Sequence, residues 1–266
     1  MASIDPRTVA DTHSPTFSVD GEVTIRDLSE VERNEKLLEL CKVALEMFGN
    51  DWNASLNVVM KRQSLSRILY YTRLYEKIVA VPGVICEFGC LYGATLALLQ
   101  NLRGIYEPYN YTRTVVGFDT FSGLSTIDPK DGTAVKEGDF STPSNYPDLL
   151  RAILSLHESF SPLSHIQKSE VVAGDVSATL PKWLEANQHA VISMAIFDMD
   201  IYTPTKDALE LILPRLTKGS VLVFDELSTK RFPGESLAVS EVLGFNNLRL
   251  QRDPHAPTCA WAVFGE

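Results

Sequence analysis

Short apolar runs, separated by segments of helical spacing, make up most of the chain from residue 84 onward. The runs are nearly continuous and rich in β-branched residues, which is typical of strands in a parallel sheet covered by helices on both faces. Five such strands are predicted, at residues 84–88, 114–118, 170–173, 192–197 and 220–224. Two more runs, at residues 248–251 and 260–264, flank the sequence DPHAP and predict an antiparallel hairpin. The pattern therefore predicts an α/β fold with a mostly parallel seven-stranded sheet.

Helical periodicity precedes the first strand. Apolar residues recur at helical spacing within residues 37–47 and again within residues 65–78, which predicts two extra N-terminal helices. Residues 1–30 mix Pro, Ser, Thr and Asp without a period, so we expect a loose arm that can order against a neighbouring subunit. The predicted organisation is this arm, a helical segment at residues 31–80 and an α/β domain at residues 81–266.

Composition and charge favour a small-molecule partner. The chain of 266 residues carries a net charge of -10 and has no Lys/Arg run, which argues against nucleic acid. It has neither a secretory leader pattern nor an apolar run near the ~20 residues of a membrane span. The four cysteines form no CxxC pair and are expected to be reduced, buried thiols. We expect a cytoplasmic protein that binds no nucleic acid and no membrane.

An acidic residue lies at or near the end of each predicted parallel strand. These acids are Glu87, Asp119, Asp175, Asp198 and Asp225. A single acid in this position is usually a helix N-cap, but ligands of open α/β sheets bind outside the carboxyl ends of the strands. Five acids in order favour a ligand site at that edge, and two of them are doubled, in the sequences DMD and DE.

The first strand runs into a glycine turn, in the stretch VICEFGCLYGATLALLQ at residues 84–100. Gly89 and Gly93 allow positive φ and let a ligand approach without a Cβ in the way. The helix that follows can bind a carboxylate at its N-terminus. A turn needed only for packing is the alternative. The G-x-G-x-x-G spacing of a dinucleotide site, with its acid about 20 residues further on, is absent.

The motif E-x-G-x-x-x-G, together with the parallel core and the hairpin, resembles the class I S-adenosylmethionine (SAM) methyltransferases, which have a Rossmann-like fold. The resemblance implies that Glu87 accepts from the ammonium group of SAM, Asp119 from both ribose hydroxyls and Asp175 from the adenine amino group. The cofactor-binding residues that it implies are Glu87, Phe88, Gly89, Gly93, Asp119, Thr120, Phe121, Asp175, Val176 and Asp198.

Four longer segments resemble the macrocin O-methyltransferase family, whose members are metal-dependent enzymes that methylate sugar hydroxyls of natural products. They are GFDTFSGL (117–124), EGDFS (137–141), IFDMDIYTPTKDALELILPRL (196–216) and GSVLVFDELSTKRFPGE (219–235). The resemblance implies a SAM-dependent O-methyltransferase of antibiotic-type biosynthesis. Its acceptor would be a small-molecule glycoside, and the enzyme would assemble as a homo-oligomer.

The same resemblance places Mg²⁺ on Asp198, Asp225 and Glu226. Asp198 would also be the general base, since sugar hydroxyls are poor acids and a bound cation lowers the pKa of a coordinated hydroxyl. Glu226 departs from the family pattern, which has a second Asp at this position. Two roles for Glu226 therefore stay equally open, that of a metal ligand and that of a solvated or hydrogen-bonded residue. Asp200 is expected near the site without binding the metal, and the long loop at residues 124–146 is expected to be a lid.

Two alternatives remain open at this point. The acceptor could be a catechol-type phenol, because enzymes that methylate such acceptors also place strand-end acids on a metal. The chain could also be a non-catalytic binding protein that has kept the same sheet.

Overall fold

The computed structural model describes residues 28–266, and the arm predicted at residues 1–30 lies outside this range except for its last three residues, which begin the first helix. The described chain divides into two compact units between residues 69 and 70. The smaller unit contains α1 (Leu28–Phe48), the 3₁₀ helices η2 (Gly49–Asp51) and η3 (Leu56–Val58), and the start of α2 (Arg62–Ile78). Both predicted N-terminal helices are confirmed.

The second half of α2 belongs to the larger unit. Its buried side chains are Tyr70, Tyr71, Leu74, Tyr75 and Ile78, and all of them join the hydrophobic core there. The larger unit therefore begins within α2, at Tyr70, earlier than the residue 81 expected from the first strand. No helix among residues 28–266 is long and apolar enough to cross a membrane.

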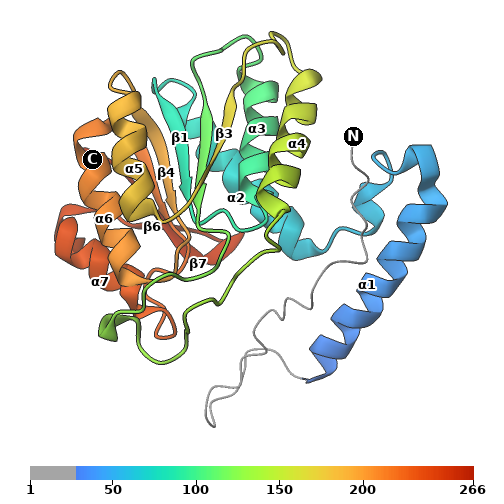
Figure 1. Ribbon diagram of the computed structural model, residues 1–266, viewed down its shortest axis with the longest axis horizontal. Coiled ribbons are helices and arrows are strands. Elements are labelled where there is room, and N and C mark those ends of the chain that lie inside the picture. The colour runs from blue at the N-terminus through green and yellow to red at the C-terminus, as the bar shows by residue number, and fades with distance from the viewer. Residues whose placement is uncertain (1–27) are drawn as a thin grey trace. The chain divides into compact units, whose positions relative to one another are not determined.

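The larger unit is built on one seven-stranded sheet in the order β3-β2-β1-β4-β5-β7-β6 (Figure 1). The strands are β1 (Val84–Phe88), β2 (Val115–Asp119), β3 (Ser169–Ala173), β4 (Ile192–Phe197), β5 (Leu216–Phe224), β6 (Gln251–Asp253) and β7 (Ala256–Val263). Strands β1 to β5 are parallel, while β7 pairs antiparallel with both β5 and β6. The predicted fold class is confirmed.

The bounds of β5 and of the two hairpin strands differ from the prediction. β5 begins at Leu216 rather than at residue 220, because Leu216 pairs with Ile192 at the start of β4. The hairpin connection contracts to Pro254 and His255, because Asp253 pairs with Ala256. The helix η6 (Phe245–Asn247) occupies the chain before β6 and delays that strand to Gln251.

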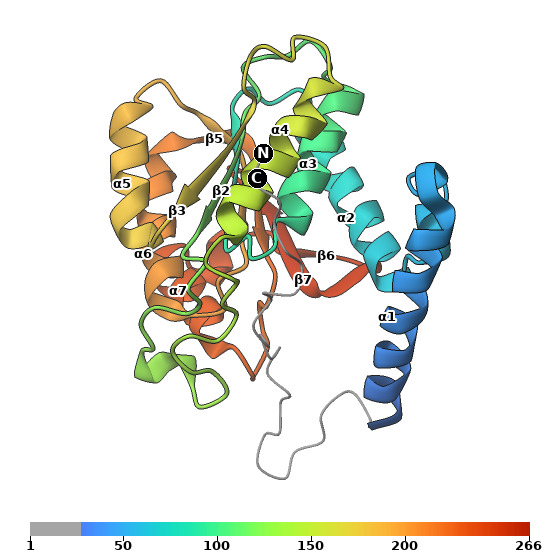
Figure 2. The same ribbon diagram turned by 45° about the vertical axis from the view of Figure 1, so that its right-hand side comes forward.

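Helices cover both faces of the sheet (Figure 2). One hydrophobic cluster joins the sheet to α2, α3 (Ala94–Tyr106) and α4 (Tyr146–Ser159). The other joins it to α5 (Val176–Ala186), α6 (Tyr202–Ile212) and α7 (Pro233–Val242). Neighbouring residues of one strand enter opposite clusters, as Ile85 and Cys86 do. This burial on both faces is why the strands read as nearly continuous apolar runs.

Four phenylalanines form a row across the carboxyl ends of the central strands. The ring of Phe88 in β1 lies 5.2 Å from that of Phe118 in β2 and 5.3 Å from that of Phe197 in β4. Phe197 in turn stacks on Phe224 of β5 at 5.4 Å. The same residues are partners in the strand register, so the four strands end at one level. Each aromatic pair contributes about 0.5–1.5 kcal/mol beyond its burial.

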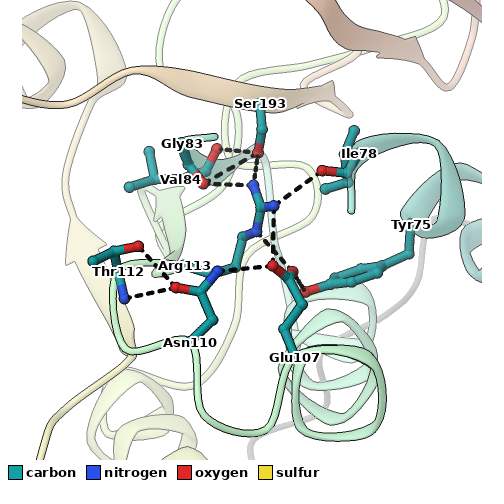
Figure 3. A network of polar contacts seen from close by, with 9 residues as sticks. All are labelled: Tyr75, Ile78, Gly83, Val84, Glu107, Asn110, Thr112, Arg113 and Ser193. Carbon is teal, nitrogen blue, oxygen red and sulfur yellow. Dashed lines mark hydrogen bonds and ion pairs between the residues drawn. The ribbon is translucent and has the colours of Figure 1, made fainter. Parts of the chain in front are cut away.

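A buried arginine ties the opposite, amino-terminal edge of the sheet together (Figure 3). Arg113, just before β2, pairs with Glu107 at 2.8 Å. Its guanidinium also donates to the carbonyl oxygens of Gly83 and Ile78 and to the Ser193 hydroxyl, at 2.6–3.0 Å. These partners come from the end of α2 and the starts of β1 and β4, so one side chain fixes three elements.

Glu107 completes this network from the end of α3. Tyr75 and Asn110 donate to its carboxylate at 2.7 and 2.8 Å. Burial acts to raise the pKa of Glu107, but hydrogen bonds from Arg113, Tyr75 and Asn110 outweigh burial and lower it. The ion pair is therefore formed throughout the neutral pH range.

Replacing Arg113 by Met should destabilise the protein strongly. The change leaves the Glu107 charge buried beside unpaired acceptors, and breaking a buried pair in this way costs about 3–5 kcal/mol. Urea unfolding measures the loss. Arg151→Met is the matched control, since Arg151 pairs with the exposed Asp148 and should cost much less. Equal losses in the two variants would contradict the assignment.

Candidate active site

Acidic residues lie next to the phenylalanine row in the sequence. Glu87 precedes the phenylalanine of β1, while Asp119, Asp198 and Asp225 follow those of β2, β4 and β5. Backbone hydrogen bonds of 2.8–3.1 Å join these strand ends from β2 through β1 and β4 to β5. Four of the five acids predicted at the carboxyl edge therefore stand on adjacent strands, aligned by one row of rings.

Backbone strain is concentrated at the same edge. Leu91, Phe121, Asp200 and Ser228 have φ values of 47, 56, 64 and 69°, and they follow β1, β2, β4 and β5. The left-handed conformation costs a non-glycine residue roughly 1–2 kcal/mol. Strained residues of this kind cluster at functional sites, so the backbone independently marks the edge that the acids mark.

The glycine turn after β1 has the predicted positive φ values, and neighbouring protein atoms account for both glycines. Gly89 and Gly93 have φ of +85 and +70°. A Cβ on Gly89 would lie 1.9 Å from the carbonyl oxygen of Asp198, and one on Gly93 would lie 2.5 Å from a methyl carbon of Leu150. Protein atoms fill both spaces and by themselves account for the two glycines, while the approach of a ligand to this turn stays a prediction. Gly89 presses the β1 turn directly onto the end of β4.

The turn can still receive an anion through its backbone. Gly93 is the N-cap of α3, and no side chain caps the first turn of that helix. The N–H groups of Gly89, Leu91 and Gly93 already donate to Phe118, Asp119 and Cys90, so the place for an anion is the start of α3 beyond Gly93, where a helix N-terminus attracts negative charge. Glu87 is 2% exposed behind this turn. A ligand with both a carboxylate and an ammonium group fits this pair of features.

Asp119 is held firmly at the end of β2. Its two carboxylate oxygens accept hydrogen bonds from the backbone N–H groups of Leu91, at 2.7 Å, and Phe121, at 2.6 Å. Burial raises its pKa, while these hydrogen bonds act to lower it. Each oxygen has a second acceptor site, so Asp119 can accept from two hydroxyls of a ligand while it joins the β1 and β2 turns.

Asp175 has the contacts of a helix cap. One oxygen accepts from the N–H of Ser177 at 2.9 Å and the other accepts from the Ser125 hydroxyl at 2.7 Å. It is the N-cap of α5, and Val176 is the first buried residue of that helix. Thr120 closes its own turn through a hydrogen bond to the Gly123 carbonyl. The capping explanation that applies to a single strand-end acid accounts for these contacts of Asp175.

Asp200 and Glu226 share an acidic environment with Asp225. Burial raises the pKa of Asp200 to about 7, and the charges of Glu226 and Asp225 add to this effect. Burial and the charge of Asp225 also raise the pKa of Glu226, which accepts from the Thr229 hydroxyl at 3.0 Å. These effects agree with the expectation that Asp200 lies near the site.

Glu235 is an acid that the sequence reasoning missed. It lies in the first turn of α7 and is 0% exposed. Burial raises its pKa well above the usual value, with contributions from the charges of Asp225, Asp198 and Asp200. An early glutamate in a helix reads as an ordinary partner of the helix dipole, so only the fold reveals its neighbours.

Cys259 is the second residue that sequence reasoning assigned no role. Its thiol donates to a carboxylate oxygen of Asp225 at 3.1 Å. Phe224 pairs with Ala260 in the β5–β7 register, which places Asp225 next to Cys259. The buried thiol expected from the sequence is confirmed, and its partner follows from strand register.

The donor chemistry at this edge fits Mg²⁺, although the side chains do not enclose an ion by themselves. Among residues 28–266, no three His, Cys, Asp or Glu side chains are arranged to hold a metal ion. The charge of Asp225 nevertheless acts to raise the pKa of Asp200, Glu226 and Glu235, a repulsion that a divalent cation would relieve. Mg²⁺ binds carboxylate oxygens and keeps several waters, so it needs few direct protein ligands. The assignment to Asp198, Asp225 and Glu226 stays a prediction.

The loop at residues 124–146 has a fixed part. Asp131 is buried and accepts from the N–H of Tyr202 at 2.6 Å. Lys130 lies over the Tyr202 ring at 3.7 Å, and Val135 packs with Ile201 and Phe232. The stretch around Asp131 is therefore anchored to the start of α6, and the prediction of a lid applies only to the rest of the loop.

Comparisons with known proteins agree with this architecture. Residues 19–241 match the family model described as Macrocin-O-methyltransferase (TylF). The crystal structure of CalS11, a calicheamicin methyltransferase, is 37% identical, covering 94% of this chain and 100% of that one at a TM-score of 0.86. The apo structure of CalS11, described as a TDP-rhamnose 3'-O-methyltransferase of calicheamicin biosynthesis, is 36% identical over 91% of this chain and 97% of that one, at 0.78.

More distant matches bear on the fold alone. The O-methyltransferase NovP is 16% identical over 74% of this chain and 79% of that one, with a TM-score of 0.57. No curated protein sequence matches the chain significantly. The family model spans most of the chain and the CalS11 similarity nearly all of it, so this protein belongs to the macrocin O-methyltransferase family and is an O-methyltransferase of the class I fold.

Proposed function

We propose that this protein transfers the methyl group of SAM to a hydroxyl of a sugar carried by a small molecule of antibiotic-type biosynthesis. The observation that carries the proposal is the set of acids on adjacent strand ends in a chain of this family. CalS11, at 36% identity, is described as acting on TDP-rhamnose. A sugar linked to a nucleotide is therefore a second candidate acceptor beside a finished glycoside.

The donor would lie across the carboxyl ends of β1 and β2. Its carboxylate would meet the uncapped start of α3, its ammonium group would meet Glu87, and its ribose hydroxyls would meet Asp119. The lack of a side-chain cap on α3 and the burial of Glu87 support this placement. Asp175 is the weakest member of the set, because capping of α5 and the contact with the Ser125 hydroxyl already account for its position.

Mg²⁺ would be held by Asp198 and Asp225, with Glu226 as the third candidate ligand. When bound, the cation supplies a Lewis acid that lowers the pKa of the acceptor hydroxyl. The Cys259 thiol occupies one oxygen of Asp225 and so orients the carboxylate. Asp198 would accept the hydroxyl proton.

Asp200 is a second candidate for the base. It is half-buried, the charges of Glu226 and Asp225 act on it, and its φ of 64° places its backbone in a strained conformation. A carboxylate that binds a cation is a weaker base than a free one, so ligand and base could be separate residues. Assembly as a homo-oligomer and a cytoplasmic location stay predictions.

Replacing Asp119 by Ala should weaken binding of S-adenosylhomocysteine. Loss of the ribose acceptor should cost about 1–3 kcal/mol, or roughly 5- to 150-fold in affinity, measured by calorimetry. Asp128→Ala is the control, because Asp128 also accepts from a backbone N–H but does so in the loop, at Lys130. Unchanged affinity in Asp119→Ala would remove the ribose assignment.

Asp198→Asn and Asp200→Asn separate ligand from base. Loss of a general base should lower kcat about 10²- to 10⁴-fold. Only the variant that also loses a ligand should need more Mg²⁺, and neither should lose affinity for S-adenosylhomocysteine. Kinetics across a Mg²⁺ titration distinguish the two. Full activity in EDTA-treated wild type, with magnesium absent by elemental analysis, would exclude the metal role.

An acceptor screen tests the substrate class. We expect labelled SAM to methylate TDP-rhamnose or a rhamnoside on the sugar, with fragmentation in the mass spectrometer placing the label. Catechol serves as the comparison acceptor. Methylation of catechol alone would overturn the sugar assignment in favour of the phenol alternative.

A further inference from the structure

Glu235 has one carboxylate oxygen in use and one without a partner. Its Oε1 accepts from the N–H of Glu226 at 3.1 Å. Its Oε2 is fully buried and has no hydrogen-bond donor among the described residues. A buried carboxylate oxygen without a partner costs free energy. A donor or a positive charge that faces Oε2 would offset this cost.

The start of α7, which carries Glu235, is tightly packed. Glu235 follows Pro233 and Gly234 at the tightly packed start of α7. A Cβ on Gly234 would lie 2.0 Å from a carboxylate oxygen of Asp131 and 2.6 Å from the backbone nitrogen of Tyr202. The backbone that carries Glu235 is therefore held against the anchored loop and the start of α6.

The surroundings of Glu235 are acidic. The charges of Asp225, Asp198 and Asp200 act on it, in that order of strength. Two of these acids are the proposed Mg²⁺ ligands, and the third is the candidate base. The partner that such surroundings favour is a cation with its waters.

We propose that Glu235 is a positioning residue of the cation site: one oxygen holds the backbone of Glu226, and the other accepts from the water shell of a divalent cation bound at Asp198 and Asp225. This inference rests on the metal part of the proposed function. Mg²⁺ keeps several waters when it binds few carboxylates, and outer carboxylates that orient such a shell tune affinity. Glu235 also keeps the two acids after β5 fixed relative to α7.

Glu235→Gln tests this role with little change of shape. Gln keeps a carbonyl oxygen for the N–H of Glu226 but loses the negative charge and one acceptor. We expect Mg²⁺ and Mn²⁺ to bind about 10- to 100-fold more weakly, measured by calorimetry for Mg²⁺ and by electron paramagnetic resonance for Mn²⁺. Affinity for S-adenosylhomocysteine should stay the same. Without metal, this variant should melt no lower than wild type, because one repelling charge is gone.

Glu210→Gln is the matched control, an exposed glutamate of α6 whose loss should leave cation affinity unchanged. Glu235→Asp is the second variant, which keeps the charge but withdraws the oxygen from Glu226. It should melt below wild type without metal and retain more of the cation response than Glu235→Gln.

The outcomes separate this inference from the proposed function. If wild type gains melting temperature with Mg²⁺ and Glu235→Gln gains as much, the role of Glu235 is wrong while the metal site stands. If wild type neither melts higher with Mg²⁺ nor binds Mn²⁺, the metal part of the proposed function fails, and the role of Glu235 fails with it.

Discussion

The active-site edge of this protein depends on the row of four phenylalanines that ends β2, β1, β4 and β5. The centroids of neighbouring rings lie 5.2–5.4 Å apart, and the four residues are register partners. A slip of one residue in any of these strands would break the row and turn the neighbouring acid to the other face. The apolar packing of the rings thus fixes the positions of the neighbouring carboxylates. Charge repulsion alone would drive these carboxylates apart.

Tight backbone contacts transmit this alignment to the turns. Gly89 lies so close to the Asp198 carbonyl that no side chain fits between them. Asp119 joins the β1 and β2 turns through Leu91 and Phe121. The proposed SAM-binding turn and the proposed metal-binding acids are therefore parts of one rigid edge. A change at one of them should be felt at the other, which is useful where methyl donor and acceptor must be aligned to within fractions of an ångström.

The sequence revealed the strands and the edge because both are local patterns. β1 and β4 have the predicted bounds, since a doubly buried strand has a nearly continuous apolar run. The extension of β5 and the short hairpin turn were missed because each depends on a partner strand. Glu235 and Cys259 were missed for the same reason: their neighbours Asp225 and Asp198 are set by helix docking and strand register. The reason for the glycines was also beyond the sequence, because the atoms that exclude a Cβ come from distant residues.

The anchored part of the loop contacts the starts of α6 and α7, next to the acidic residues of the site. The carboxylate of Asp131 accepts from the N–H groups of Tyr202 and Asp128, and burial raises its pKa while these bonds act to lower it. Gly234 has no room for a side chain beside the same carboxylate. Asp131 thereby holds the start of α6, which follows Asp200, beside the start of α7, which carries Glu235. The anchored stretch of the loop and these two acids therefore depend on the same helix ends for their positions.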